Sequence, residues 1–329
     1  MALSGAVDAH THLYSGLATL GMPAPATPPA DFVGILEQVW WRLDRALDAA
    51  SLRASAELYL ADCLRFGTTT IVDHHESPGF IEGSLDVLAD VAHGFGLRLA
   101  TCYGATERNG GREEARRGLA ECARFARENR RPHVKAMVGL HASFTVSDET
   151  ICEAGSLARA LGTVVHVHVA EDRADVVDAE RRGYPGPLER LLALDGLPPG
   201  SIVAHGVFLD AAQVRAADAA GLWLVQNPRS NEGNRVGYPA ALSASSRVAL
   251  GTDGYPADMD AEAAALARLA EAHGDRAYAG RLAAGHRLAE ALFGPGEPTP
   301  RSLNETEYAA IRAGAAQQAD ALWTRMRSL

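Results

Sequence analysis

The stretch VKAMVGLHASFTVSDETICEAGSLARALGTVVHVHV (134–169) holds a strand, a helix and a second strand in succession. The apolar runs at 134–140 and 163–169 predict the strands, and the helical spacing of apolar side chains over 147–161 predicts the helix between them. Such a unit places two parallel strands in one sheet through a right-handed crossover. The stretch therefore predicts an α/β fold.

The same alternation of strands and helices extends outward from this stretch in both directions. The predicted strands are Ala6–Leu13, Thr68–Asp73, Leu97–Tyr103, Val134–Leu140, Thr163–Val169, Ser201–His205, Leu222–Gln226 and Arg247–Gly251. The predicted helices are Asp31–Phe66, Ile81–Phe95, Arg112–Asn129, Ser147–Leu161, Arg173–Leu194, Ala211–Ala220 and Asp258–His273. Eight strand–helix units indicate a (β/α)8 barrel of the TIM type. An open, doubly wound sheet would instead carry a G-x-G-x-x-G turn after an early strand, and the sequence has none.

The segment LFGPGEPTPR (292–301) is dense in glycine and proline and interrupts this alternation. We interpret residues 1–293 as the barrel. Residues 294–329 then form a linker and a C-terminal helix, predicted over Glu305–Met326, that packs on the barrel through a stripe of apolar side chains.

Composition and charge disfavour several classes of protein. The chain has 329 residues, of which 47% are hydrophobic and 22% are charged, as is ordinary for a globular protein. Its 31 basic and 41 acidic residues give a net charge of −10, so nucleic acid is an unfavourable partner. No apolar run reaches bilayer length. Residues 1–5 lack the basic and apolar parts of a signal peptide, and the four scattered cysteines suit a reducing compartment. We therefore expect a cytoplasmic protein that does not bind membranes.

Histidines and carboxylates gather at the predicted carboxyl ends of the first, fifth, sixth and eighth strands. They are His10, His12, His166, His168, Glu171, His205 and Asp253. The i, i+2 spacing of each histidine pair places both rings on one face of its strand, although one such pair alone is equally consistent with packing. Barrel enzymes build their sites at this end of the strands, and imidazole and carboxylate groups are ligands of Zn²⁺. The pattern predicts a metal-dependent active site in which Glu171 acts as a general acid or base.

The motifs that carry these residues resemble those of a known family. They are VDAHTHL (7–13), GTTTIVDHH (67–75), HASFTVSD (141–148), HVHVAED (166–172), IVAHG (202–206), NPRSN (227–231) and LGTDG (250–254). Together they resemble the amidohydrolase superfamily, in its branch of aminohydrolases and chlorohydrolases, which includes guanine deaminases and s-triazine hydrolases. WWRLDRALD (40–48) and NPRSNEGNRVGY (227–238) are most similar to the SsnA-type aminohydrolases of that branch. The resemblance covers the chain from Val7 to about Phe293.

The resemblance also implies roles for individual residues. The implied metal ligands are His10, His12, His168 and Asp253, and His141 corresponds to a substrate-contacting position. We also expect His75, Glu107, Gln226 and Arg235 to bind substrate. Glu171 corresponds to the carboxylate that carries protons, and His205 to a second acid or base. Asp253 would also help to move a proton to the leaving group.

The number of metal ions follows from the fourth predicted strand. Binuclear relatives bridge two ions with a carboxylated lysine at the carboxyl end of this strand. Here that end is Leu140-His141, and Lys135 lies at the opposite end. We therefore expect one divalent ion, Zn²⁺, with Fe²⁺ as the alternative.

The implied reaction is the hydrolytic deamination of a small nitrogen heterocycle with release of ammonia. Opening of a cyclic amide, or displacement of another leaving group, is an alternative for the same site. A metal-binding remnant without catalysis is an alternative of another class, and the retention of Glu171 and His205 argues against it. The expected partners are a small-molecule substrate and a second copy of the chain in a dimer.

Some features depart from the family pattern. Relatives build a β-sandwich from segments on both sides of the barrel, and we expect none here. Gln226 stands where SsnA-type proteins have histidine, Gly104 where they have an acidic residue, and Arg235 where they have a small one. These changes indicate either neutral drift or an altered substrate, and Arg235 would favour an anionic group if it reached the pocket. The adjacent Trp40 and Trp41 are interpreted as ordinary helix packing.

Overall fold

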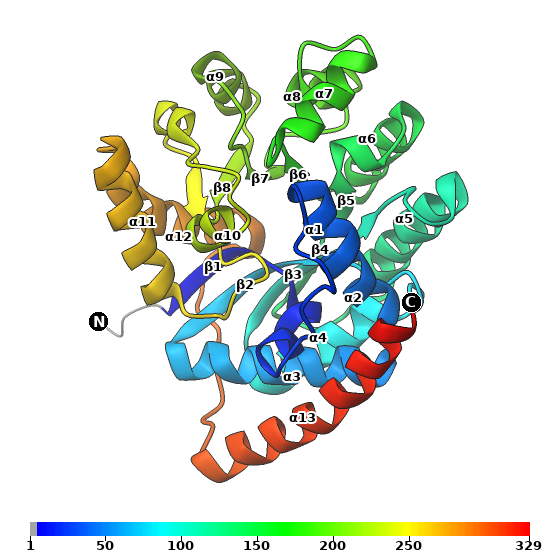
Figure 1. The fold of residues 1–329 in the computed structure, drawn as a ribbon. Helices are drawn as coiled ribbons and strands as arrows, with labels where there is room; N and C mark the ends of the chain where they lie inside the picture. The colour runs from blue at the N-terminus through cyan, green and yellow to red at the C-terminus, as the bar shows by residue number, and fades with distance from the viewer. Residues whose placement is uncertain (1–4) are drawn as a thin grey trace.

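Parallel strands in the computed structural model form one barrel-shaped sheet, at the centre of Figure 1. The structure describes residues 5–329, so residues 1–4, part of the segment in which no signal peptide is expected, lie outside it. The strands are β1 (Ala6–Thr11), β2 (Thr68–His75), β3 (Arg98–Ala105), β4 (Val134–Ala136), β5 (Val138–Ala142), β6 (Val165–Val169), β7 (Ile202–His205), β8 (Trp223–Gln226) and β9 (Val248–Leu250). They pair in the order β1-β2-β3-β5-β6-β7-β8-β9, and a parallel bridge between Thr11 and Asp253 closes the ring. The predicted (β/α)8 barrel is confirmed.

The strand predicted over Val134–Leu140 is two short strands, β4 and β5, in the structure. Both pair with β3. Between them the backbone amide of Met137 donates to the carbonyl oxygen of Thr101 at 2.9 Å. Because β5 also pairs with β6, the irregularity leaves the ring continuous.

Helices cover the outside of the ring and part of its mouth (Figure 1). They are α1 (Phe32–Ile35), α2 (Trp41–Ala46), α3 (Ala49–Phe66), α4 (Ser84–Phe95), α5 (Gly111–Glu128), α6 (Asp148–Leu161), α7 (Arg173–Arg181), α8 (Pro187–Ala193), α9 (Ala211–Ala219), α10 (Pro228–Gly233), α11 (Met259–His273), α12 (Arg281–Phe293) and α13 (Glu305–Ser328). Helices α1, α2 and α10 contribute to the mouth, at the carboxyl ends of the strands. The sequence did not predict α10 or α12.

The single helix predicted over Asp31–Phe66 is interrupted in the structure. It consists of α1, a π-helical turn (η2, Leu36–Trp40), α2 and α3. The break lies at Leu47, where ψ is 141°. Asp48 accounts for it, because its carboxylate accepts a hydrogen bond from the amide of Ser51 at 2.8 Å and so caps the start of α3.

The helix predicted over Arg173–Leu194 is likewise two helices, α7 and α8. Gly183 ends the first segment with φ of 88°, a left-handed conformation that glycine adopts without strain. Pro187 begins the second segment. At the first position of a helix the backbone amide has no partner within the helix, so the missing amide proton of proline costs no hydrogen bond there.

The predicted tail helix is present as α13 and lies along α3 on the outside of the barrel (Figure 1). The indole nitrogen of Trp323 donates to the carbonyl oxygen of Leu20 at 3.1 Å. The guanidinium of Arg325 donates to the carbonyl oxygen of Ala46 at 2.8 Å. Within residues 5–329 every strand belongs to the barrel sheet, so this part of the chain contains no β-sandwich.

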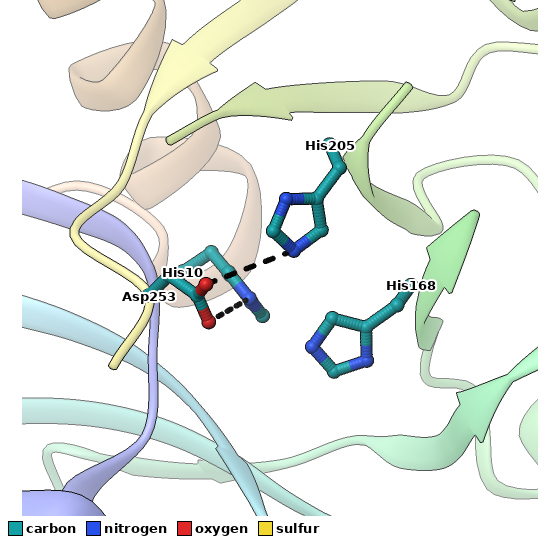
Figure 2. Close-up of side chains that lie close together, drawn as sticks. All are labelled: His10, His168, His205 and Asp253. Atoms are coloured by element: carbon teal, nitrogen blue, oxygen red, sulfur yellow. Dashed lines mark ion pairs between the residues drawn. The ribbon is translucent and has the colours of Figure 1, made fainter. Parts of the chain in front are cut away.

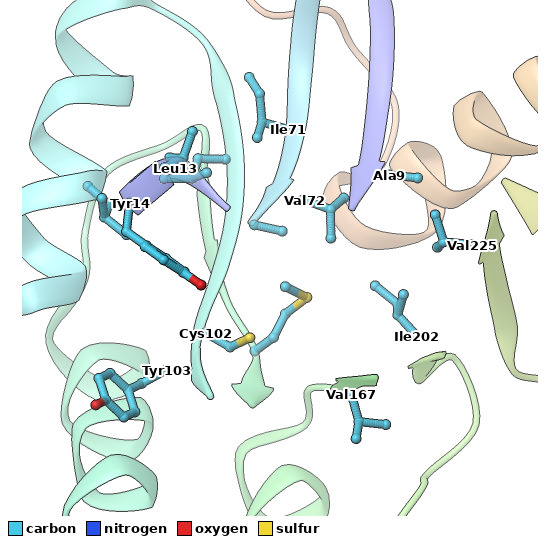
Figure 3. Close-up of a cluster of buried hydrophobic side chains, with 14 of the residues drawn as sticks. Ala9, Leu13, Tyr14, Ile71, Val72, Cys102, Tyr103, Val167, Ile202 and Val225 are labelled. Carbon is cyan, nitrogen blue, oxygen red and sulfur yellow. The ribbon is translucent and has the colours of Figure 1, made fainter. Parts of the chain in front are cut away.

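The main hydrophobic core includes apolar side chains from several strands. Figure 3 shows Ala9, Val72, Ile202 and Val225, from four different strands, in one buried cluster. All four are 0% exposed. This packing fixes the strands whose ends carry the polar residues described next. No helix in residues 5–329 has the length and apolarity needed to cross a bilayer.

Candidate active site

The four predicted metal ligands lie together at the mouth of the barrel. Nε2 of His12 is 2.9 Å from Oδ1 of Asp253, and Nε2 of His10 is 3.5 Å from the same oxygen. Nε2 of His12 is also 3.2 Å from Nε2 of His168. These donors come from β1, the end of β6 and the turn after β9, so closure of the barrel brings them together.

The imidazole rings are held so that Nε2 faces the centre of this group. Nδ1 of His12 donates to the carbonyl oxygen of His74 at 2.6 Å, and Nδ1 of His168 donates to the carbonyl oxygen of His141. With the proton on Nδ1, each Nε2 offers a lone pair, as in metal-binding histidines. Nε2 of His10 is buried and has no hydrogen-bond partner among the described residues. The donor set therefore fits a divalent metal ion.

The protonation of these groups agrees with a cation site. Burial lowers the pKa of His10 to about 3 and that of His168 well below its ordinary value, so both are neutral, as metal binding requires. For His12, burial is outweighed by the Asp253 and Glu76 carboxylates, which raise the pKa to about 9. A metal ion would take the place of the proton between His12 and Asp253.

His205 lies as close to this centre as the predicted ligands do. One donor atom from each of His10, His168, His205 and Asp253 lies within 4.8 Å of the others. Figure 2 shows these four side chains pointing towards one another. Nδ1 of His205 is 3.0 Å from Oδ1 of Asn231, which leaves Nε2 facing the centre when the ring is neutral. His205 can therefore act on an oxygen bound there or add to the ligands, and its predicted acid–base role stays a prediction.

Glu171 stands beside His205, as an acid–base residue requires. Its Oε2 is 3.5 Å from Nε2 of His205, and its Oε1 accepts a hydrogen bond from the side chain of Asn234 at 3.3 Å. Burial raises the pKa of Glu171 to about 7 and outweighs the lowering effect of His205. A carboxyl group with this pKa can both take up and return a proton near neutral pH.

Backbone strain is concentrated around the same centre. Ala170, His205 and Asp253 have φ of 53°, 74° and 56°, values that side-chain-bearing residues rarely adopt. Each costs on the order of 1–3 kcal/mol and persists only where the surrounding structure enforces it. His205 pairs with Val169 and not with the inward-facing His168, so a regular strand would point its ring away from the centre. The left-handed backbone at His205 turns the ring back towards the centre.

A cavity of about 680 Å³, including the part open to solvent, lies above these residues. It is lined by His12, Tyr14, Phe32, Leu36, Trp40, Trp41, Glu76, His141, Ala142, Phe144, His168, Glu171, Asp172, Asp175, Asn234, Asp253 and Gly254. Aromatic side chains form one part of the wall and carboxylates another. Trp40 and Trp41, interpreted from sequence as helix packing, belong to the cavity wall because η2 and α2 cross the mouth of the barrel.

Of the two histidines predicted to bind substrate, one lines the cavity and the other does not. His141 lines the cavity, with Nδ1 3.0 Å from the hydroxyl of Thr145. His75 is fully buried outside the cavity lining, packs against Tyr14 and Tyr103, and has Nε2 2.8 Å from the hydroxyl of Ser77.

The other three predicted substrate residues are not among those that line the cavity. The Glu107 carboxylate accepts a hydrogen bond from the hydroxyl of Ser147 at 2.6 Å, near the start of α6. Gln226 is fully buried, and its amide oxygen accepts a hydrogen bond from Arg281. Arg235 is exposed, with φ of 58°. Their contact with substrate stays a prediction.

Sequence reasoning missed two residues on β2 and just after it. His74 lies inside the ring, with its ring centroid 4.6 Å from that of His168. Glu76 lines the cavity and is 1% exposed. The DHHE run (73–76) at the end of a predicted strand was the available signal, because alternation places 74 and 76 on one face and 75 on the other.

Sequence reasoning also missed the polar residues of α10 and its end. Ser230 donates to Oδ2 of Asp253, and Asn231 contacts His205. Asn234 contacts Glu171. The NPRSN motif (227–231), together with Asn234 at the end of α10, thus holds Asp253, His205 and Glu171 in position from outside the centre.

The chain matches known proteins over nearly all of the barrel. Residues 1–294 match the amidohydrolase family. A 5'-deoxyadenosine deaminase of Methanopyrus kandleri is 28% identical over 261 residues, or 77% of this chain and 57% of the relative. An 8-oxoguanine deaminase of Pseudomonas aeruginosa is 28% identical over 270 residues, or 77% of this chain and 59% of that protein. The chain thus spans somewhat more than half the length of these relatives.

Solved structures show the same fold. The crystal structure of an adenosine deaminase from Xanthomonas campestris with bound zinc superimposes with a TM-score of 0.75 at 23% identity, over 99% of this chain and 86% of that one. A guanine deaminase from C. acetobutylicum superimposes with a TM-score of 0.72 at 15% identity, over 90% of this chain and 74% of that one. With the match over residues 1–294, the chain belongs to the amidohydrolase family.

Proposed function

We propose that the protein is a metal-dependent hydrolase that deaminates a small nitrogen heterocycle. The observation that carries this proposal is the place of Glu171, which lies between the aromatic cavity and the histidine–aspartate centre, 3.5 Å from His205. A site that only held a metal would need neither residue. The names of the relatives, which are deaminases of adenine- or guanine-containing molecules, support the same reaction class.

The centre would hold one divalent ion, which we propose to be Zn²⁺, through His10, His12, His168 and Asp253. Bound there, such an ion polarises a water molecule and lowers its pKa towards ~7. The zinc in the related adenosine deaminase structure supports this choice of metal.

The side chains supply the proton transfers. Glu171 takes a proton from the water and passes it to a ring nitrogen of the substrate, which makes the adjacent carbon more electrophilic. The water oxygen bonds to that carbon, and His205 stabilises the charge that develops on the oxygen. Asp253 then assists transfer of the second water proton to the amino group. The carbon–nitrogen bond breaks, ammonia leaves, and the ring carbon becomes a carbonyl.

The test is an ammonia-release assay on zinc-loaded protein with a panel of aminated purines, pyrimidines and triazines. We expect at least one to be deaminated, and Glu171→Gln to slow the release by ~10²-fold or more. Glu180→Gln on the exposed side of α7 is the matched control and should be fully active. Opening of the ring without release of ammonia would favour the alternative that the enzyme hydrolyses a cyclic amide. A protein that binds its full complement of metal but acts on no compound would favour the alternative of a metal-binding remnant without catalysis.

A further inference from the structure

Glu76 is a buried carboxylate that the reaction proposed above does not use. It follows β2, is 1% exposed and lines the cavity. Its Oε1 lies 2.7 Å from Nδ1 of His74, and its Oε2 lies 3.6 Å from Nδ1 of His12. Oε2 has no hydrogen-bond partner in the described part of the chain. A buried carboxylate oxygen without a hydrogen bond is costly, so a ligand that donates to Oε2 would gain more affinity than at the surface.

The neighbouring histidines satisfy at most one oxygen of this carboxylate. Nδ1 of His12 already donates to the carbonyl oxygen of His74 at 2.6 Å. Nε2 of His74 is 3.0 Å from the carbonyl oxygen of Leu140 and so carries a proton. Nδ1 of His74 lies 2.7 Å from Oε1 and can pair with that oxygen, whereas Oε2 is 3.6 Å from Nδ1 of His12, whose proton is already used. The carboxylate retains acceptor capacity that faces the cavity.

Gly104 on β3 makes room for this arrangement. A Cβ atom at position 104 would lie 2.5 Å from Oε1 of Glu76 and 2.5 Å from Cε1 of His74, closer than real contacts allow. A side chain there would displace one or both groups. Because Gly104 has no side chain, the carboxylate of Glu76, which follows the adjacent strand β2, occupies the space beside it.

The rest of the cavity defines what Glu76 could bind. Tyr14, Phe32 and Trp41 supply flat apolar surface for a planar ring. Glu171 follows β6, which β3 and β5 separate from β2 in the ring of strands. A ring whose reacting carbon lies near Glu171 would therefore extend another edge towards Glu76.

We propose that Glu76 anchors the substrate and selects planar heterocycles that present paired N–H donors, of the amidine or guanidine kind, on the edge away from the reacting carbon. The proposal rests on the proposed function, and it names the substrate class of that site. Two parallel N–H groups match the two oxygens of a carboxylate. Rings that present only acceptors or an anionic group on this edge would be excluded, because they would leave Glu76 unpaired or repelled.

Binding of benzamidine to the zinc-loaded protein tests this without requiring turnover. Benzamidine is a planar ring with a cationic amidine, and benzamide is its neutral counterpart of the same shape. By calorimetry we expect the wild type to bind benzamidine at least tenfold more tightly than benzamide, the effect of one charge-assisted hydrogen bond. Glu76→Gln should remove this preference and leave the affinity for benzamide unchanged, whereas a collapsed pocket would weaken both. Gly104→Ala should reduce the preference as well, and Glu180→Gln should retain it.

A preference that survives Glu76→Gln would overturn the proposal, because Glu171 or Asp253 would then hold the cation. A wild-type protein without any preference would overturn it too. The two claims can fail independently. If no heterocycle releases ammonia but Glu76→Gln still removes the preference for benzamidine, the proposed deamination is wrong and the role of Glu76 in binding stands.

Discussion

Replacing Trp323 in α13 by alanine tests how the tail helix is held on the barrel. The indole is 4% exposed, and its nitrogen donates to the carbonyl oxygen of Leu20 at 3.1 Å. Replacing a buried tryptophan by alanine costs about 3–5 kcal/mol through lost burial and the cavity left behind. If this cost falls on the docking of α13, the population of the detached helix rises by a factor of about 10² to 5 × 10³.

Limited proteolysis measures that population directly. Arg312 is exposed but lies inside α13, so trypsin can cleave after it only when the helix opens. We expect the rate of this cleavage under native conditions to rise by the same factor in Trp323→Ala. Trp323→Phe retains most of the ring and loses the hydrogen bond, so it should raise the rate only about fivefold. Exposed Thr324→Ala is the control and should leave it unchanged.

The Trp323→Ala substitution should also affect substrate binding in the cavity. The guanidinium of Arg42 in α2 donates to the carbonyl oxygen of Met326 at 3.1 Å, and Arg325 donates to that of Ala46. Since α2 also carries Trp41 of the cavity wall, detachment of α13 should raise KM more than it lowers kcat. Equal cleavage of Trp323→Ala and wild type would refute the reasoning, because α13 would then not depend on this contact.

Three further substitutions test the site. His168→Ala should retain the barrel fold but lose the metal, measured as bound zinc per chain after desalting; two tightly bound ions in the wild type would contradict the single-ion prediction. Glu171→Gln should retain zinc and lower kcat by ~10²-fold or more, because an amide cannot carry the proton; if it stays active, His205 is the next candidate for the base. Arg235→Ala should leave KM equal for anionic and neutral substrates, since Arg235 is exposed and outside the cavity lining; a selective rise for anionic substrates would instead place its side chain at the substrate.

Much of the histidine–aspartate centre was predictable because it depends on local spacing. The i, i+2 pairs and the ends of predicted strands bring His10, His12, His168 and Asp253 together once the barrel closes. The prediction that His75 binds substrate shows the limit of this reasoning. Adjacent residues of a strand face opposite sides, so a one-residue difference decides between the inside of the ring and the helix layer. The structure places His74 inside the ring and His75 against Tyr103.

The cavity wall was not predictable because it depends on contacts between distant segments. Trp41 lines the cavity only because η2 and α2 cross the mouth of the barrel. Gln226 lies at the expected strand end, yet its partner is Arg281 from α12, a helix that the sequence did not predict. The role of Gly104 appears only when Glu76 on the adjacent strand is seen beside it.

The central claim is that water, activated at the histidine–aspartate centre, replaces an amino group on a ring carbon. Turnover of the best substrate from the ammonia screen in ¹⁸O-labelled water tests it most directly, with the product examined by mass spectrometry. The account predicts one ¹⁸O atom in the product carbonyl for each ammonia released by the zinc-loaded wild type, and at most about one hundredth as much labelled product from His168→Ala or Glu171→Gln in the same time. Ammonia released without ¹⁸O in the product, or label taken up equally by all three proteins, would contradict it.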